Sequence, residues 1–284
     1  MTTMRAFGLG VLASVLAVGC AAAQGKKWET VRIATEGAYA PWNFTTPSGK
    51  LDGFEVELAN DLCGRMKVKC EVVAQDWDGI IPSLNAGKYD AIMAGMNITE
   101  KRLEVLNFSQ PYAATPHGFA VMKDSPLANL PGTGTAISID KDPEAAKKAI
   151  EAWKPLLKGK TVGVQVSTVN ATFVEKYLKD TVEIREYKTT EQHDLDLVAG
   201  RLDAIFAGQG ALTATIDKPE FKNVTLAGTG VRGDVLGRGV AVGLRKADTE
   251  LKTLFDQAIS AAVADGTVKK LSEKWFKIDA APQS

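Results

Sequence analysis

The residues best suited to binding a charged small molecule follow the first predicted strand, at 31–34. Glu36 and Tyr39 lie in the segment EGAYAPW at 36–42, which follows this strand after one residue. A carboxylate offers charge-assisted hydrogen bonds to a cation, and an aromatic ring offers a flat apolar wall. Trp77, which stands between two aspartates, would add a second ring. These residues predict a site for a cationic group; the alternative is a loop with a solvated glutamate and packed aromatics.

Arg102 and the segment STVN at 167–170 could bind an anion. Thr99 is a natural helix N-cap, which places Arg102 in the first turn of a short helix. A guanidinium there can grip a carboxylate with two hydrogen bonds. The segment STVN opens a helix in the second half of the chain, and the free N–H groups of a helix start attract anions. The alternative for Arg102 is a solvated side chain paired with a nearby glutamate. The alternative for the segment STVN is plain helix capping.

The sequence gives little support for a catalytic site or a metal site. The chain has two histidines, His117 and His193, and three cysteines, which argues against a His/Cys metal site. No Ser/His/Asp or Cys/His set accompanies His117, so it is expected to be a hinge-side ligand contact or a plain hinge residue. His193 is expected to be exposed on a helix. The segment GTGVRG at 228–233 matches a dinucleotide fingerprint by its letters, but no helix follows until about residue 248. These patterns favour binding over catalysis, with no cofactor and no metal.

Composition is that of a soluble globular chain. Its 284 residues are 45% hydrophobic and 24% charged, which suffices for one large core or two medium ones. Lys and Arg number 34, as do Asp and Glu, and no block of like charge stands out. This balance argues against nucleic acid and anionic membrane surfaces as partners.

The first 23 residues are predicted to be an export signal. Arg5 supplies a positive start, residues 7–18 form a short apolar run, and AAA at 21–23 offers a small-residue cleavage site. The run is too short for a permanent membrane helix. The alternative is a lipid anchor at Cys20, which is disfavoured because Ala17 stands where such signals usually carry Leu.

Two cysteines remain after the signal is lost, Cys63 and Cys70. Six residues separate them and read as a helix end turning into a strand. In an oxidising compartment this predicts a structural disulfide. The alternative, a redox pair, usually has only two residues between its cysteines.

An internal repeat indicates the architecture. The segment LNAGKYDAIMAG at 84–95 recurs as LVAGRLDAIFAG at 197–208. Each copy reads as a helix end, a glycine cap, a basic residue and a short buried strand that stops at glycine. Strand-like openings at 31–34 and 162–165 precede the copies. The sequence therefore predicts two α/β lobes, with any ligand at the carboxyl ends of the strands.

Other elements fill out the lobes. A helix is predicted at 54–66, where apolar residues recur every four positions. The segment 124–160 is expected to be an insertion on the surface of the second lobe, with a helix at 143–157. Residues 248–276 read as two helices split at Asp265-Gly266.

Six motifs in order resemble the periplasmic amino-acid-binding proteins of ABC importers, and the match spans essentially the mature chain. The motifs are YAP (39–41), GFEVEL (53–58), DWDGIIP (76–82), ITEKR (98–102), FSQPY (108–112) and AGRLDA (199–204). The resemblance is to the branch that holds the octopine- and nopaline-binding and the lysine/arginine/ornithine-binding proteins, in which a bridge at the Cys63–Cys70 position also occurs.

This resemblance implies a hinged, two-lobed α/β protein that closes on one small ligand in the periplasm. The first lobe would comprise 24–113 and 232–284, and the second 118–227. The crossings would lie near 114–117 and 228–231. The expected partners are an amino-acid-type ligand and a membrane ABC permease, and the protein is expected to be a monomer.

The family also implies roles for the site residues. Tyr39 and Trp77 would sandwich the ligand side chain, and Glu36 would reach its cationic end. The Arg102 side chain, with the main-chain N–H groups of Asn97 and Val169, would hold the α-carboxylate. The remaining positions expected to contact the ligand are Ala94, Gly95, His117, Gln165, Thr168 and Gly208.

Gly208 bears on the choice of ligand. Binders of free basic amino acids carry an Asp at this position, where it fixes the α-ammonium, and a buried ammonium without its acid is costly. Glycines at 95 and 208 are expected to open space for a substituted α-nitrogen, as in an opine. The alternative ligands are free arginine, ornithine, lysine or histidine.

Two further classes of protein stay open. One is a periplasmic lyase on the same scaffold, for which Glu36 is the only obvious general acid. The other is a ligand-sensing partner of a membrane receptor, which would use the same closure.

Overall fold

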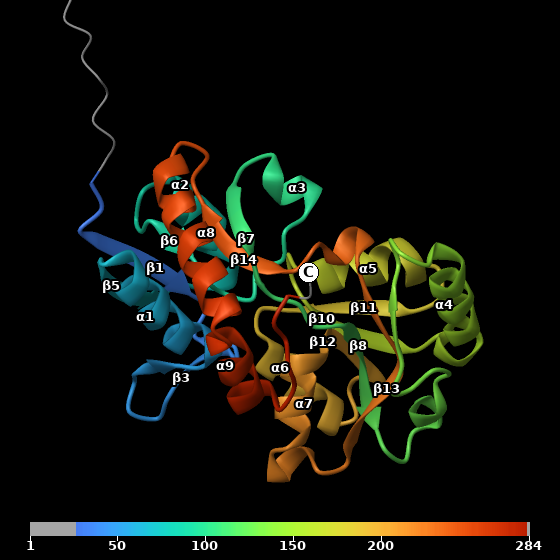
Figure 1. Cartoon of the computed structure of the whole chain (residues 1–284). Helices are drawn as coiled ribbons and strands as arrows, with labels where there is room; N and C mark the ends of the chain where they lie inside the picture. Colours follow the sequence, from blue (N-terminus) through green and yellow to red (C-terminus); the bar gives the residue numbers. More distant parts are fainter. Residues whose placement is uncertain (1–26, 283–284) are drawn as a thin grey trace, which may run out of the picture.

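The computed structural model describes residues 27–282, and these form two α/β lobes, each built around its own sheet (Figure 1). The predicted export signal and Cys20 lie outside the described residues. Within 27–282, no helix is both long enough and apolar enough to cross a membrane.

The first lobe has a five-stranded sheet with the order β5-β1-β6-β14-β7. Its strands are β1 (Thr30–Thr35), β5 (Lys69–Ala74), β6 (Ala91–Ile92), β7 (Asn107–Ala113) and β14 (Val240–Leu244). β1 runs parallel to β5 and β6, whereas β14 is antiparallel to β6 and β7. A small antiparallel sheet follows β1 and consists of β2 (Ala38–Tyr39), β3 (Asn43–Thr45) and β4 (Leu51–Asp52).

The helices of the first lobe come from both ends of the chain. They are α1 (Phe54–Met66), η1 (Trp77–Gly79), α2 (Ile80–Asn85), α3 (Glu100–Leu103), α8 (Thr249–Ala264) and α9 (Thr267–Phe276). The predicted helix at 54–66 is confirmed, as is the split between the two C-terminal helices at 265–266. α1, α8 and α9 share one apolar core with β1 and β14, so the C-terminal segment completes the first lobe.

The second lobe has a six-stranded sheet with the order β11-β10-β12-β8-β13-β9. Its strands are β8 (His117–Met122), β9 (Ala136–Ser138), β10 (Thr161–Gln165), β11 (Glu183–Tyr187), β12 (Ala204–Gly208) and β13 (Val224–Arg232). Its helices are η2 (Pro126–Asn129), α4 (Pro143–Leu157), α5 (Val169–Leu178), α6 (Thr190–Val198), α7 (Gln209–Ile216) and η3 (Pro219–Phe221), and η4 (Asp234–Leu236) follows β13.

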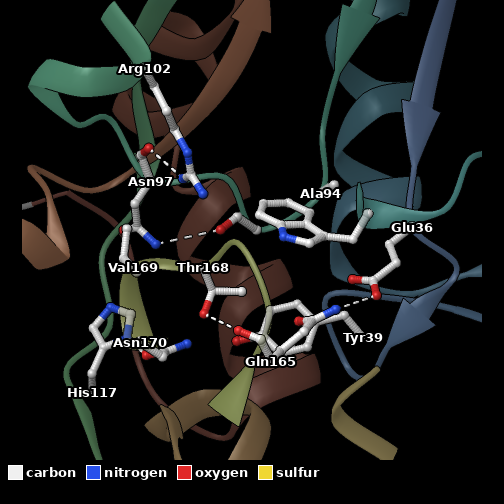
Figure 2. A pocket seen from close by; sticks show the side chains of 12 residues that line it. Glu36, Tyr39, Ala94, Asn97, Arg102, His117, Gln165, Thr168, Val169 and Asn170 are labelled. Atoms are coloured by element: carbon white, nitrogen blue, oxygen red, sulfur yellow. Dashed lines mark hydrogen bonds between the residues drawn. The ribbon is translucent and has the colours of Figure 1, made fainter. Parts of the chain in front are cut away.

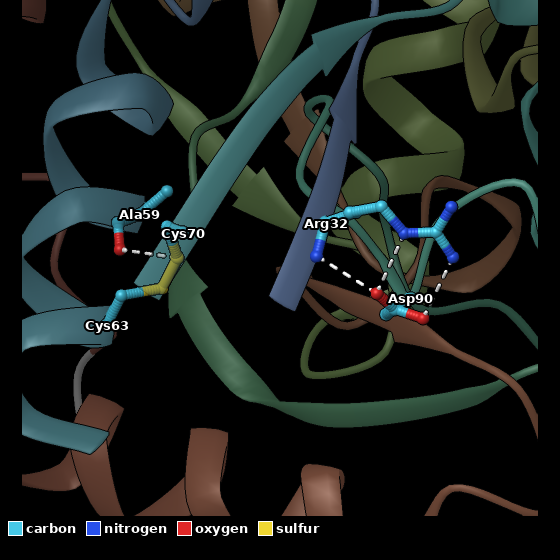
Figure 3. Close-up of a disulfide and its surroundings, with 5 residues drawn as sticks. All are labelled: Arg32, Ala59, Cys63, Cys70 and Asp90. Carbon is cyan, nitrogen blue, oxygen red and sulfur yellow. Dashed lines mark hydrogen bonds and ion pairs between the residues drawn. A yellow bond between two sulfur atoms is a disulfide. The ribbon is translucent and has the colours of Figure 1, made fainter. Parts of the chain in front are cut away.

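The internal repeat is confirmed in three dimensions, because each copy supplies the strand next to the opening strand of its lobe. β6 pairs in parallel with β1, and β12 pairs in parallel with β10. The aspartates of the two copies make equivalent contacts. Asp90 accepts a hydrogen bond of 3.0 Å from the N–H of Arg32 (Figure 3), and Asp203 accepts one of 2.9 Å from the N–H of Thr161. The two sheets consequently have equivalent carboxyl edges.

The two predicted cysteines are joined in a disulfide (Figure 3). Cys63 lies in the last turn of α1 and Cys70 near the start of β5, with their Cα atoms 6.0 Å apart. The bridge therefore fastens α1 to the edge strand of the first sheet.

The chain passes between the sheets twice. β7 of the first sheet ends at Ala113 and β8 of the second begins at His117, so one passage lies between these two residues. The second predicted crossing, 228–231, lies within β13, which pairs with β8 and β9; the chain then reaches β14 at Val240. The lobe boundaries stay a prediction.

One expectation for the second lobe is confirmed and another is wrong. The helix expected at 143–157 is α4, which packs on the lobe through one buried face, where Trp153 lies edge-on against Phe119 of β8. His193 is buried rather than exposed. Gly163 in β10 makes room for it, since a Cβ at Gly163 would lie 3.2 Å from the Cβ of His193.

Candidate ligand-binding site

A cavity lies where the carboxyl edges of the two sheets face each other (Figure 2). Both lobes contribute to its walls. The lining residues are Glu36, Tyr39, Trp77, Ala94, Gly95, Asn97, Arg102, His117, Gln165, Thr168, Val169 and Asn170. The structure thus brings together every residue expected to contact the ligand except Gly208, and it adds Asn170.

Glu36 follows the last residue of β1 and forms the acidic end of the cavity. Its carboxylate is buried and accepts a hydrogen bond of 2.6 Å from the side-chain amide of Gln165, at the end of β10 (Figure 2). Burial raises the pKa of Glu36 to about 7, and the nearby charge of Glu55 adds to the shift. No cationic side chain of residues 27–282 pairs with it.

Arg102 forms the basic end. Thr99 caps α3 by accepting from the N–H of Arg102, which fixes where the side chain leaves the helix. The guanidinium donates to the carbonyl of Asn97 at 2.9 Å and to that of Ser167 at 3.5 Å, and it lies 5.2 Å from the centre of the Trp77 ring. Burial lowers its pKa to about 10. In the described part of the chain no carboxylate forms an ion pair with it.

The start of α5 faces the cavity from the second lobe. Thr168 is its N-cap: the hydroxyl donates to the carbonyl of Gln165 and accepts from the N–H of Ala171. Val169 is the first helical residue, so its N–H has no partner within the helix. Ser167 takes a left-handed conformation, with φ of 60°, to make the turn between β10 and α5. This arrangement offers free N–H groups to an anion.

His117 and Asn170 contribute a neutral polar wall. The Nδ1 atom of His117 lies 2.7 Å from the side-chain oxygen of Asn170, and both residues are buried. Burial lowers the pKa of His117 to about 4, so the ring is uncharged at neutral pH. Within residues 27–282, no three His, Cys, Asp or Glu side chains are grouped so that they could hold a metal ion.

The two glycines do not leave open space in this structure, because Tyr39 fills it. A Cβ at Gly95 would lie 2.8 Å from Cε1 of Tyr39, and a Cβ at Gly208 would lie 2.9 Å from its hydroxyl oxygen. Gly208 therefore lies against the Tyr39 hydroxyl and is not one of the residues that line the cavity. Any ligand group that reached Gly208 would have to displace this ring.

Asn170 is the lining residue that sequence reasoning left without a role. Its position in the first turn of α5 was visible, but its partner His117 is 53 residues away in sequence. The fold brings the two together, because β10, which leads into α5, and β8 lie on either side of β12 in the second sheet. No local pattern signals such a pair.

The cavity combines an acid without a cationic partner, a guanidinium without an anionic partner, and two aromatic rings. Such a set can hold a small molecule that carries a carboxylate at one end and a cation at the other.

Comparison with known proteins agrees with this geometry. The family model for bacterial extracellular solute-binding proteins, family 3, matches residues 31–278. An octopine-binding periplasmic protein of Rhizobium meliloti is 50% identical over 98% of this chain and 100% of its own length. An L-arginine-binding protein of Pseudomonas aeruginosa is 36% identical over 95% of this chain and 96% of its own.

Among solved structures, a periplasmic His/Glu/Gln/Arg/opine family-binding protein from Silicibacter pomeroyi, in complex with lysine, superposes with a TM-score of 0.70. It is 35% identical, and the alignment covers 89% of this chain and 100% of that one. The family match over most of the chain, together with these two-lobed relatives, shows that the chain belongs to family 3 of the bacterial extracellular solute-binding proteins.

Proposed function

We propose that this protein is the periplasmic receptor of an ABC importer and captures an octopine-like opine, an arginine derivative with a substituted α-nitrogen. The observation that carries the proposal is the pair of unpaired charges in one cavity. Glu36 has no cationic partner and Arg102 no anionic partner among the described residues. A ligand with a guanidinium and a carboxylate would supply both.

The ligand would be held between the lobes. Tyr39 and Trp77 would flank its aliphatic stem, Glu36 would meet the guanidinium, and Arg102 with the start of α5 would bind the carboxylate. The other lining residues would shape the cavity. Because the two walls belong to different lobes, binding would shift the protein toward its closed form, which the permease recognises.

The residue at 208 favours an opine over a free amino acid, because a glycine there adds no second acid to the site. A free α-ammonium would need a buried acid beside it, and Glu36, the one carboxylate among the described lining residues, would already meet the guanidinium. The octopine-binding protein of Rhizobium meliloti, at 50% identity, supports the same choice. The alternative is a free basic amino acid, supported by the relative that was solved with lysine.

Calorimetric titration of ligand-stripped mature protein would test the proposal. The compounds are octopine, nopaline, arginine, ornithine, lysine and histidine. Tight binding of an opine alone is the expected result. Tight binding of a free basic amino acid would refute the argument from Gly208 while leaving the receptor role intact, and binding of none would refute the proposed site.

Two other aspects of the proposal follow from the same function. The protein would act as a monomer without catalysing a reaction, and an assay with prephenate and arogenate would detect the lyase alternative.

Residues 1–23 would be removed on export, leaving Cys20 out of the mature chain. Mass spectrometry of the exported protein would distinguish cleavage from lipidation at Cys20.

A further inference from the structure

Glu55 is a buried carboxylate that lies behind the cavity rather than on its wall. It stands in the first turn of α1 and is 1% exposed. One oxygen accepts from the backbone N–H of Gly95 at 2.7 Å and from the hydroxyl of Tyr112, and the other accepts from the side-chain amide of Asn43 at 2.7 Å. The oxygen of that amide accepts from the N–H of Gly37 at 2.7 Å.

This network ends on two backbone groups of the site. Gly95 lines the cavity and lies against the Tyr39 ring, and Gly37 directly follows Glu36. Both glycines have positive φ angles, 62° and 73°. Since glycine is the most flexible residue, each needs a fixed partner to keep one conformation. Glu55 supplies that partner directly for Gly95 and through Asn43 for Gly37.

Burial raises the pKa of Glu55, whereas the hydrogen bonds that it accepts lower it, and their pattern suits an ionised carboxylate. A backbone N–H can only donate, and the Asn43 amide turns its N–H toward Glu55 because its oxygen is taken by Gly37. The start of α1 also favours a negative charge there. A second carboxylate behind Glu36 makes the acidic end of the cavity more attractive to a cation.

We propose that Glu55 is a positioning residue of the binding site. Its carboxylate holds Gly95 and, through Asn43, Gly37, and so sets where Tyr39 and Glu36 meet the ligand. This inference rests on the proposed function of the cavity. The competing explanation is that Glu55 only stabilises the lobe.

The decisive comparison is between Glu55→Gln and the swap Asn43→Asp/Glu55→Gln. In the single variant the new amide N–H₂ faces the N–H₂ of Asn43, so the network breaks. In the swap the new carboxylate at position 43 accepts from the new amide at position 55 and from the N–H of Gly37, which restores every bond and the total charge. Glu57→Gln is the matched control, because Glu57 lies on the same helix and pairs at the surface with Lys274.

Titration with octopine and with arginine between pH 6 and 9 gives the first readout. Glu55→Gln should weaken binding by about tenfold or more, since it leaves buried donors without an acceptor. It should also shift the rise of affinity with pH to lower pH, because the pKa of Glu36 falls when the neighbouring charge of Glu55 is lost. The swap should recover affinity to within about threefold of wild type, and Glu57→Gln should match wild type.

The amide signals of Gly95 and Gly37 in ligand-free protein give a second readout by NMR. Both should shift in Glu55→Gln and return in the swap. If wild-type protein binds neither compound, the proposed function fails, while these signals still test Glu55. If Glu55→Gln does not fold, Asn43→Ala takes its place, because it removes the branch of the network that leads to Gly37. Asn43→Ala should weaken binding and shift the amide signal of Gly37 but not that of Gly95.

Two results would overturn the inference. One is that Glu55→Gln, or Asn43→Ala in its place, binds with wild-type affinity and leaves the glycine amide signals unchanged. The other is a swap that regains stability and the amide signals but not affinity, which would leave Glu55 with a structural role only.

Discussion

The side-chain amide of Gln165 donates a hydrogen bond of 2.6 Å to the carboxylate of Glu36, from the end of β10 in one lobe to the end of β1 in the other. An amide satisfies an oxygen of the carboxylate but brings no positive charge. Burial consequently still raises the pKa of Glu36 to about 7. The contact keeps Glu36 in place between the lobes and leaves its charge available to a cation.

Glu36→Gln should make the ligand-free protein more stable at pH 8. A carboxyl whose pKa is raised on folding favours the folded state below its unfolded pKa, and this benefit is lost as the pH rises from about 4.5 to about 7. Ionised Glu36 would then cost about 3 kcal/mol, which the neutral amide avoids. Urea unfolding at pH 8 should show the gain, and at pH 5 the difference should shrink. A variant no more stable than wild type at pH 8 would contradict the raised pKa.

Binding of a guanidinium ligand should release protons near pH 6.5. Glu36 is mostly protonated there in the free protein, since its pKa is about 7, and a cation beside it would lower that pKa. Affinity should therefore rise with pH and level off above about pH 8. Calorimetry in buffers of different ionisation enthalpy measures the release. Glu36→Gln is the control and should release none, and a wild type that also releases none would place the guanidinium elsewhere.

Much of the fold could be predicted because it depends on local signals. The repeat around Asp90 and Asp203 indicated both the glycine cap and the buried strand, and each aspartate bonds the opening strand of its own lobe. Most cavity residues were also predictable, since they follow strand ends or helix starts that a motif marks. What brings them into one cavity is the equivalence of the two carboxyl edges.

Contacts between distant side chains could not be predicted in the same way. The Tyr39 ring fills the space at both Gly95 and Gly208, which depends on its rotamer and on how closely the lobes approach. Likewise, the segment 228–231 reads as a glycine-rich connection, yet pairing with β9 makes it part of a strand. Both outcomes are decided by tertiary partners that a local pattern does not contain.

Removal of the disulfide should weaken the fold without changing ligand affinity. Replacing Cys63 and Cys70 by Ser should lower the free energy of unfolding by about 2.5 kcal/mol, since the bridge closes a short loop. Cys70 pairs with Val31 at the start of β1, whereas the cavity lies beyond its end. Urea unfolding and calorimetry measure the two effects. A large loss of affinity would mean that the bridge also controls the cavity.

Gly208→Asp should disfavour an opine and favour a free amino acid. The backbone at 208 has φ of −61°, so a side chain causes no strain there, but its Cβ would lie 2.9 Å from the Tyr39 hydroxyl. Gly208→Ala is the matched control, because it adds the bulk without the charge. Octopine should bind more weakly to both variants, and arginine should bind more tightly to the Asp variant alone. An unchanged preference in competition calorimetry would mean that residue 208 does not meet the α-nitrogen.

Arg102→Ala should abolish tight binding and leave the protein folded. Without the guanidinium a ligand carboxylate would be buried unpaired, which should weaken binding by about 100-fold or more. The fold should lose little, because Arg102 forms no ion pair among the described residues and bonds only to carbonyl groups.

Two further variants make the Arg102 result specific. Arg102→Lys keeps the charge but not the two-pronged geometry, so its affinity should fall between wild type and Arg102→Ala. Lys101→Ala removes an exposed charge one residue away and should bind as wild type does. Calorimetry with octopine and arginine, alongside urea unfolding, measures all three. Near-normal affinity in Arg102→Ala would exclude this guanidinium as the carboxylate-binding group, because no neutral neighbour could replace a buried counter-charge at so small a cost.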